Sequence, residues 1–312
     1  MGRNLFVDFA KVAMAFMVLA IHTGFLSEVN GPIEHLLDQG LFRIAVPLFF
    51  IFNGYYLGRD IDDSRGTFTL IKRVLLLYGF WMLVYAPFYW YVEGASLFAS
   101  FKNILRNFIA GYFQMWYLIG MVYALVLLWL LRKLPVALLV TVAMLLLLGG
   151  VALQYLNAYT AANLPVSYYR NGILFGFPFM VAGYLVRRYG EQVATKTAVY
   201  ALLIGLTLLM AESLLSYYYS RPHFGFDLYL SLIVAAPAAA LLLVRTERKI
   251  KTDRTAKLST EMYLIHPLMI AVAVAVFHLP RSGTALFLVA SLLSLLAFVP
   301  IYYLSRKIRF IL

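Results

Sequence analysis

The chain has 312 residues, of which 63% are hydrophobic and only 13% are charged, whereas a soluble domain is about half apolar and a quarter charged. This composition excludes a soluble globular protein and predicts an all-α, polytopic membrane protein with one transmembrane domain over residues 1–312. The absence of cysteine excludes disulfides and thiol catalysis. The net charge of +12 lies in short segments between apolar runs, which favours a role in membrane topology over nucleic-acid binding.

Ten apolar runs are long enough, or nearly so, to cross a bilayer as helices, for which about 20 residues are needed. The first is interpreted as a retained span, because no small-residue cleavage site of a signal peptide follows it. In chain order the predicted spans are Leu5–Phe25, Leu41–Leu57, Leu70–Tyr91, Trp116–Leu131, Val136–Leu156, Asn171–Val186, Thr197–Ser216, Phe226–Val244, Leu258–His278 and Thr284–Leu304.

The basic residues are unevenly distributed between the segments that join these spans. With the N-terminus placed in the cytoplasm, most of the 26 Lys and Arg residues fall in inner segments and few in outer ones. Short cytoplasmic loops are enriched in Lys and Arg. The pattern therefore predicts ten spans with both termini cytoplasmic, in the inner (cytoplasmic) membrane of a cell.

The first span carries two ionisable residues, Lys11 and His22. Charged groups at membrane depth are costly, so each is a candidate functional residue. Their spacing returns to nearly the same helix face after a rise of about 16 Å. A deep lysine suits a phosphate or carbonyl group, and a desolvated histidine suits a general base. The alternative is that Lys11 extends to the inner interface and His22 makes a structural hydrogen bond.

The second span begins with Arg43 near the outer face and contains Pro47. Arg43 is predicted to orient His22 or to hold an anionic acceptor; the alternative is that it anchors the helix at the interface. Proline removes a backbone hydrogen bond, which a membrane tolerates where a cavity or a neighbouring helix compensates.

Later spans hold further candidates. Glu212 lies near the outer end of the seventh span, Glu261 near the inner end of the ninth, and His266 deeper in the same helix. The inner loop Arg245–Lys257 is rich in Lys and Arg. It is predicted either to hold the phosphates of an anionic ligand or to set topology and contact anionic lipids.

Several of these segments, in this order, resemble membrane acyltransferase family 3. The first span repeats the family's spacing of a basic residue, ten residues and a histidine, with Lys11 where most members have arginine. The second contains the run Phe-Arg-Ile-Ala-Val-Pro-Leu-Phe-Phe from Phe42, and then Asn53-Gly54-Tyr55 where the family has Ser-Gly-Tyr. Two later matches are Trp116-Tyr117-Leu118 and Glu261-Met262-Tyr263-Leu264-Ile265-His266-Pro267. Tyr169–Ile173 and the Arg43 motif also resemble the membrane half of membrane-bound serine racemases.

The resemblance implies a membrane O-acyltransferase, usually an O-acetyltransferase. It would move an acyl group from cytoplasmic acyl-CoA (acetyl-CoA) to a hydroxyl of a cell-surface polysaccharide or lipid-linked glycan of the cell envelope. The expected reaction uses no metal, its partners are the membrane lipids and the glycan, and the oligomeric state stays open. Predicted catalytic residues are His22 and Arg43, predicted donor-binding residues are Lys11, Arg73, Lys257, Glu261 and His266, and predicted acceptor-binding residues are Trp116, Tyr117, Arg170 and Glu212.

A small-molecule (amino-acid) transporter or flippase is the alternative. Lys11, His22, Glu212 and Glu261 would then form an ion or substrate path. Transporters often have paired, interrupted helices in two halves, and the sequence shows no such pairing. Entry of CoA from the cytoplasmic side would separate the enzyme from the transporter.

Overall fold

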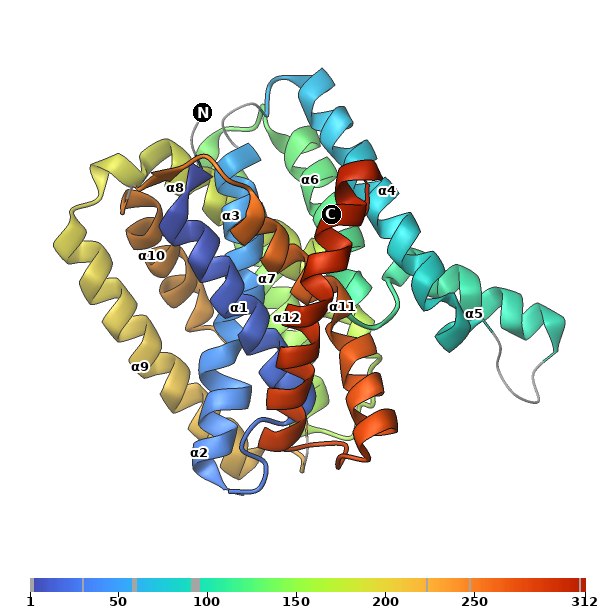
Figure 1. Ribbon diagram of the computed structural model, residues 1–312. Helices are drawn as coiled ribbons and strands as arrows, with labels where there is room; N and C mark the ends of the chain where they lie inside the picture. Colours follow the sequence, from blue (N-terminus) through green and yellow to red (C-terminus); the bar gives the residue numbers. More distant parts are fainter. Residues whose placement is uncertain are drawn as a thin grey trace.

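The computed structural model describes residues 3–29, 31–57, 61–90, 96–222, 224–246, 248–308 and 310–312. It is a bundle of helices, with α5 projecting from its side (Figure 1). Short helical pieces (α2 Pro32–His35, η1 Leu36–Gly40, η2 Leu41–Ile44, η3 Phe113–Met115, η4 Val166–Tyr168, η5 Gly172–Gly176, η6 Gly190–Gln192) lead into or join the long helices. The long helices are α1 (Leu5–Thr23), α3 (Ala45–Leu57), α4 (Ser64–Tyr89), α5 (Leu97–Ala110), α6 (Trp116–Leu131), α7 (Val136–Tyr159), α8 (Phe177–Tyr189), α9 (Thr195–Tyr219), α10 (Leu232–Arg245), α11 (Arg254–Phe277) and α12 (Thr284–Lys307).

Within the described ranges, eight helical segments are long and apolar enough to cross a membrane. They are Leu5–Thr23, Pro32–Leu57, Ser64–Tyr89, Phe113–Leu131, Val136–Tyr159, Thr195–Tyr219, Arg254–Phe277 and Thr284–Lys307. The helices of the other two predicted spans are shorter, with 13 residues in α8 and 14 in α10. The all-α, polytopic membrane architecture is therefore confirmed, whereas the count of ten crossings stays a prediction. Tyr91, the end of the third predicted span, lies outside the described residues.

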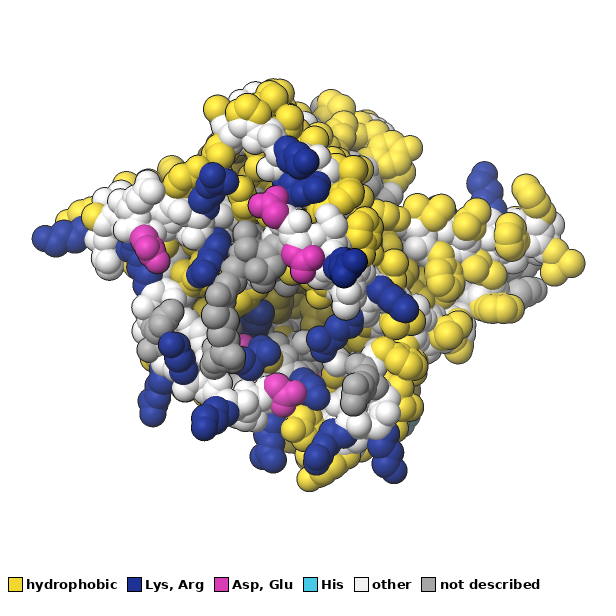
Figure 2. Space-filling view, turned by 90° about the horizontal axis from the view of Figure 1, so that it is seen from above, with side chains coloured by type: hydrophobic (Ala, Val, Ile, Leu, Met, Phe, Trp, Pro, Cys, Tyr) yellow, Lys and Arg dark blue, Asp and Glu magenta, His cyan; other side chains and the backbone are white. Residues whose placement is uncertain are grey.

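Both ends of the chain lie at the same end of the bundle. Strand β1 (Arg3–Asn4) pairs with β2 (Lys249–Ile250), with Arg3 opposite Ile250. Arg3 and the C-terminal Leu312 line the same cavity. We call this the basic end, because Figure 2, which views it directly, shows Lys and Arg side chains around a central hollow. Termini at one end are what an even number of crossings requires; the assignment of this end to the cytoplasm stays a prediction.

Helices α3 and α8 cross with their backbones in contact. A Cβ atom at Gly54 would lie 2.0 Å from the carbonyl oxygen of Met180, and one at Gly183 would lie 1.9 Å from that of Ile51. Glycine is therefore required at both positions for this approach, as is common where membrane helices pack closely. The crossing fixes α3, which follows the short η2 element that carries Arg43, against the centre of the bundle.

The eighth predicted span, Phe226–Val244, is only partly helical. Helix α10 begins at Leu232, and residues 226–229 have no helical backbone, so the prediction of a helix was wrong over this stretch. Non-helical backbone at membrane depth is tolerated only where its polar groups find partners inside the protein. The segment 224–231 meets that condition through the side chains of three other helical elements.

Gln39, Gln154 and Glu212 supply these partners. Gln39 Oε1 accepts from the Phe226 amide at 2.9 Å. Gln154 Oε1 accepts from the amides of Asp227 at 2.8 Å and Leu228 at 3.0 Å, and its Nε2 donates to the Leu228 carbonyl at 2.6 Å. The Glu212 carboxylate accepts from the amides of Leu230 and Ser231 at 3.1 and 2.8 Å. The unwound segment is thus held in one conformation, and it places Asp227 in the interior.

The orientation is tested by single cysteines, since the chain has none of its own. We expect Ser282→Cys, between α11 and α12, and Thr252→Cys, between β2 and α11, to react with a membrane-impermeant thiol reagent from opposite sides of intact cells. Ser282→Cys should be labelled from outside and Thr252→Cys only after permeabilisation. Labelling of both cysteines in intact cells would contradict the topology.

Candidate active site

Two histidines from separate helices come together inside the bundle. The rings of His22, near the end of α1, and His266, in the middle of α11, are stacked with centroids 5.1 Å apart and planes at 22°. The Phe113 ring lies 4.8 Å from His22. His266 is fully buried, and His22 is partly accessible. The sequence indicated both residues separately, and the structure makes them one pair.

The tautomer of His266 follows from the residue after it. Pro267 has no amide hydrogen, so the Tyr263 carbonyl lacks its intrahelical donor. His266 Nδ1 lies 2.8 Å from that oxygen and 3.2 Å from the Met262 carbonyl. Carbonyl oxygens only accept hydrogen bonds, so Nδ1 carries the proton and Nε2 keeps a free lone pair. This Nε2 is buried and has no partner among the described residues, which marks a place for a ligand's polar group.

Gln114, just before α6, adds a second such atom. Its side-chain Nε2 donates to the Leu264 carbonyl at 3.1 Å, and its backbone carbonyl accepts from the Tyr263 hydroxyl at 2.5 Å. Its Oε1 is buried and has no hydrogen-bond partner within the described part of the chain. The sequence analysis missed Gln114, although its place two residues before Trp116 was a usable signal. The preceding Phe113 has a φ of +45°, a strained conformation for a side-chain-bearing residue beside a candidate site.

A charged cluster forms around Asp227. Asp227, on the unwound segment, bridges two arginines: its Oδ1 is 3.2 Å from Arg43 Nη1 and its Oδ2 is 3.7 Å from Arg170 Nη1. Gln39 Oε1 accepts from Arg43 at 2.7 Å. Helix α1, which carries His22, packs against η2, which carries Arg43. Asp227 therefore holds Arg43, at the edge of the histidine-bearing helix, together with Arg170 as their shared counter-ion.

Asp227, Gln39 and Gln154 were not predicted from the sequence. Asp227 falls inside the eighth predicted span and Gln154 inside the fifth, so the rule that singles out polar residues at membrane depth would have found both. Their partners were not available to sequence reasoning, because Asp227 is 184 positions from Arg43 and 57 from Arg170. Only the tertiary structure joins them.

A separate cavity of about 270 Å³ opens at the basic end, where Figure 2 shows the hollow. It is lined by four cations, Arg3, Lys11, Arg73 and Lys257, and by one acid, Asp253. Asp253 pairs with Lys257 at 3.2 Å, and Arg3 pairs with Asp8, which does not line the cavity, at 2.9 Å. Three of the predicted donor-binding residues, Lys11, Arg73 and Lys257, thus line one cavity although they belong to three helices. Glu247 of the predicted phosphate-binding loop lies outside the described residues. The inner wall of the cavity is formed by Phe49, Asn53, Leu77, Tyr117, Leu118, Met121, Tyr263 and Leu264, among others.

Three aromatic rings close the inner end of this cavity. Phe49, Tyr117 and Tyr263 contact one another with centroid distances of 5.8, 6.1 and 5.2 Å. The other side of Tyr263 faces His266 at 6.0 Å. Neither His22 nor His266 is among the described residues that line the cavity. The ring cluster therefore separates the cationic cavity from the imidazole pair by the thickness of one side-chain layer.

The remaining predicted residues have the following places. Glu261 is fully buried, its carboxylate oxygens have no hydrogen-bond partner among the described residues, and it does not line the cavity. Trp116 lies under the Arg170 guanidinium at 5.6 Å, close to the Asp227 cluster. The Tyr117 hydroxyl accepts from Asn53 on the cavity side. Glu212 is engaged by the backbone of the unwound segment and by the Tyr155 hydroxyl.

Comparison with known proteins bears on this arrangement. A family model described as an acyltransferase domain, of the third acyltransferase family, matches residues 4–304. The chain belongs to this acyltransferase family. The family resemblance inferred from the motifs is confirmed. The histidine pair, the arginine cluster and the cationic cavity, apart from its lining residues Arg3 and Leu312, lie within the matched region.

The acyltransferase is also similar to longer proteins. It is 26% identical over 330 aligned positions to an amino-acid racemase of Enterococcus faecalis, covering 97% of this chain and 46% of the relative. It is 28% identical over 296 positions to a serine/alanine racemase of Enterococcus gallinarum, covering 86% of this chain and 41% of the relative. The chain therefore spans less than half the length of these relatives. No solved structure matches.

Proposed function

We propose that this acyltransferase moves an acyl group, most simply acetyl, from acyl-CoA bound at the basic end to a hydroxyl of a glycan at the opposite end. The observation that carries the proposal is the placement of Tyr263 in α11. Its ring lines the cationic cavity on one side and contacts His266 on the other. A donor site and a candidate base thus lie on the two sides of one ring cluster.

The cavity has the chemistry that an acyl-CoA requires. The four cations that line it suit the phosphates, because charge-assisted contacts to phosphate are stronger than neutral hydrogen bonds. The deeper wall, with Phe49, Leu118 and Leu264, suits a narrow and mostly apolar thioester arm. Lys11 is the one Lys or Arg residue of α1. Its Nζ lies 5.7 Å from the centroid of the Phe52 ring and 5.4 Å from that of the Tyr56 ring. The thioester has to pass the Phe49–Tyr117–Tyr263 cluster to reach the histidines.

His22 is the proposed general base. It accepts the proton of the acceptor hydroxyl while the hydroxyl oxygen attacks the thioester carbonyl carbon. The carbon–sulfur bond breaks, and CoA leaves as the thiolate, which takes up a proton. His266 presents a lone pair on Nε2 beside this ring because Nδ1 is committed to the backbone. Arg43 and Arg170, held by Asp227, are placed to stabilise negative charge on the carbonyl oxygen.

The class of acceptor is inferred from the side chains around Asp227. Sugar hydroxyls are recognised by planar groups that donate and accept several hydrogen bonds and by aromatic faces. Arg170, Asp227 and Trp116 supply such groups in contact with one another. We therefore propose a cell-surface or lipid-linked glycan of the cell envelope as acceptor, and the inner membrane as the site of the reaction.

Donor binding is the direct test. We expect isothermal titration of the purified protein to detect acetyl-CoA and free CoA, and Lys11→Ala and Lys257→Ala to weaken binding about tenfold each, since 1.4 kcal/mol of lost charge interaction is tenfold in Kd. Lys102→Ala, on the exposed face of α5, is the matched control and should bind as the wild type does. Absence of binding to wild-type protein in both detergent and nanodiscs would refute the donor.

A second function is favoured by the names of the relatives. The names of both relatives describe racemases of amino acids, and this chain spans less than half the length of each. An α-amino acid carries one carboxylate and one ammonium group, which the Arg170 and Asp227 side chains match in charge. Saturable uptake of serine or alanine into proteoliposomes without CoA would favour this transporter over the acyltransferase.

A further inference from the structure

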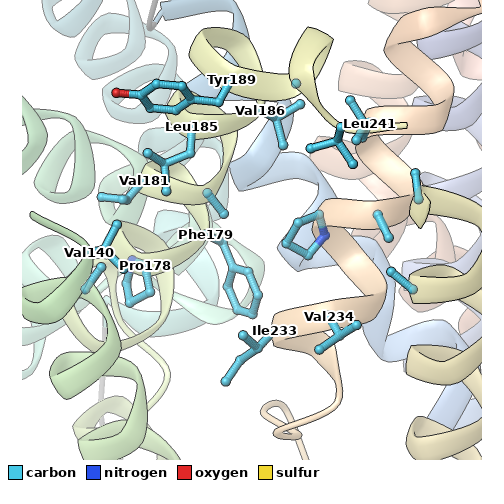
Figure 3. Close-up of a pocket in the computed structure, with 18 of the residues that line it drawn as sticks. Val140, Pro178, Phe179, Val181, Leu185, Val186, Tyr189, Ile233, Val234 and Leu241 are labelled. Carbon is cyan, nitrogen blue, oxygen red and sulfur yellow. The ribbon is translucent and has the colours of Figure 1, made fainter. Parts of the chain in front are cut away.

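A second cavity lies between α7, α8, α9 and α10, away from the histidines (Figure 3). Its volume is about 420 Å³, larger than the cationic cavity. Figure 3 shows Val140, Phe179, Ile233 and Leu241 facing it from three of these helices. Apart from the Tyr189 and Thr197 side chains, the lining residues are all apolar or glycine.

Small and helix-breaking residues create this space. Pro178 and Pro237, in α8 and α10, both line it, together with Ala182 and Ala201. Helix α7 packs on α8, and α9 packs on α10, so the cavity lies where the two pairs face each other. An apolar cavity of about 150 Å³ is large enough to hold benzene. This one is nearly three times that size and fits several carbons of a hydrocarbon chain.

The mouth of the cavity is at the basic end and is strongly cationic. Gly190 and Val193 line the cavity, and their carbonyl oxygens accept hydrogen bonds from the Arg245 guanidinium. These carbonyl groups are neutral partners, so the Arg245 guanidinium keeps its full charge beside the cavity.

Lys196, beside Thr197, adds a further exposed cation to this mouth, and Glu191 is the acid nearest to it in the chain. Positive charge therefore surrounds the entrance of an otherwise apolar cavity. A ligand that matches both has a hydrocarbon tail and an anionic head. Basic segments at a membrane surface attract anionic lipid head groups.

We propose that this cavity binds one acyl chain of an anionic phospholipid from the leaflet at the basic end, with the phosphate held at the mouth by Arg245 and Lys196. The site holds α8 against α9 and α10 through the bound chain. Because α8 also crosses α3, the lipid supports the helix that follows the short η2 element carrying Arg43. The site is independent of the donor cavity, with which it shares no described lining residue.

The experiment uses the full chain, delipidated in detergent and supplied with dioleoyl-phosphatidylglycerol or with dioleoyl-phosphatidylcholine. Native mass spectrometry counts retained lipid, and a thermal melt measures stabilisation. We expect wild-type protein to retain phosphatidylglycerol in preference to phosphatidylcholine. Ala201→Phe, which fills the cavity, should bind phosphatidylglycerol at least about tenfold more weakly. Val199→Phe adds the same side chain to the exposed face of the same helix and should bind as the wild type does.

Two further variants keep the proposal falsifiable. Ala201→Leu is a milder filling variant for the case in which Ala201→Phe does not fold. Arg245→Gln with Lys196→Gln should remove the preference for phosphatidylglycerol while leaving the cavity open. Equal retention by wild-type and cavity-filled protein, or equal binding of the two lipids by wild-type protein, would overturn the assignment. Acyl transfer is not the readout, so failure here is distinct from failure of the proposed reaction.

Discussion

Replacing His22 by Gln is expected to lower acyl transfer by 10²–10⁴-fold, the usual loss when a positioned general base is removed. Glutamine has similar size and hydrogen-bonding capacity, so the packing against His266 and Phe113 should survive. The fall should appear in kcat rather than in the Kd for acetyl-CoA, because His22 does not line the described wall of the donor cavity. The assay is transfer of labelled acetyl to cell-surface glycan, with size-exclusion chromatography to verify folding.

His278→Gln is the matched control for this substitution. His278 follows α11 with an exposed side chain, outside the histidine pair. It should keep wild-type turnover, which shows that the loss is specific to position 22. A well-folded His22→Gln protein with turnover close to wild type would remove His22 from the mechanism. The base would then be sought at His266, whose Nε2 lone pair is free.

Replacing Asp227 by Asn is expected to cause the largest loss of stability among single substitutions in the charged cluster. Asp227 is 13% exposed and is the shared counter-ion of Arg43 and Arg170, which are 11% and 29% exposed. Removing one partner of a buried ion pair typically costs about 3–5 kcal/mol. Arg43 keeps a second acid, Asp38, whose Oδ2 lies 3.9 Å from its Nη2, so the charge left without compensation is mainly that of Arg170 and the cost should lie at the lower end of this range. A cost of that size should lower Tm by about 5–10 °C in a thermal melt.

The control is another Asp–Arg pair in the same chain. Asp62 lies 3.7 Å from Arg132 but is 90% exposed. Exposed pairs contribute about 0–1 kcal/mol, so Asp62→Asn should leave Tm nearly unchanged. An equal, small effect of both substitutions would show that Arg43 and Arg170 do not depend on Asp227, and the proposed electrostatic role of the cluster would lose its structural basis.

The local sequence alone contained much of the candidate site. Lys11 and His22 were recognisable because ionisable residues are rare inside apolar helices. His266 and Pro267 were recognisable because they occur in a motif shared with a known family. The helix positions were equally readable, since apolar runs of about 20 residues have few structural alternatives in a bilayer. The one clear error, the helical assignment of residues 226–229, arose because the backbone there is satisfied by side chains rather than by the next helical turn.

The sequence by itself determined that this chain is an all-α, polytopic membrane protein of the acyltransferase family, because hydrophobic length and motif order are local properties. Only the tertiary structure decided that His22 stacks on His266, that Asp227 bridges Arg43 and Arg170, and that Lys11, Arg73 and Lys257 line one cavity. These contacts join residues far apart in the chain. Their formation depends on which helix faces pack together, and the spacing of polar residues within one apolar helix leaves its neighbours undefined.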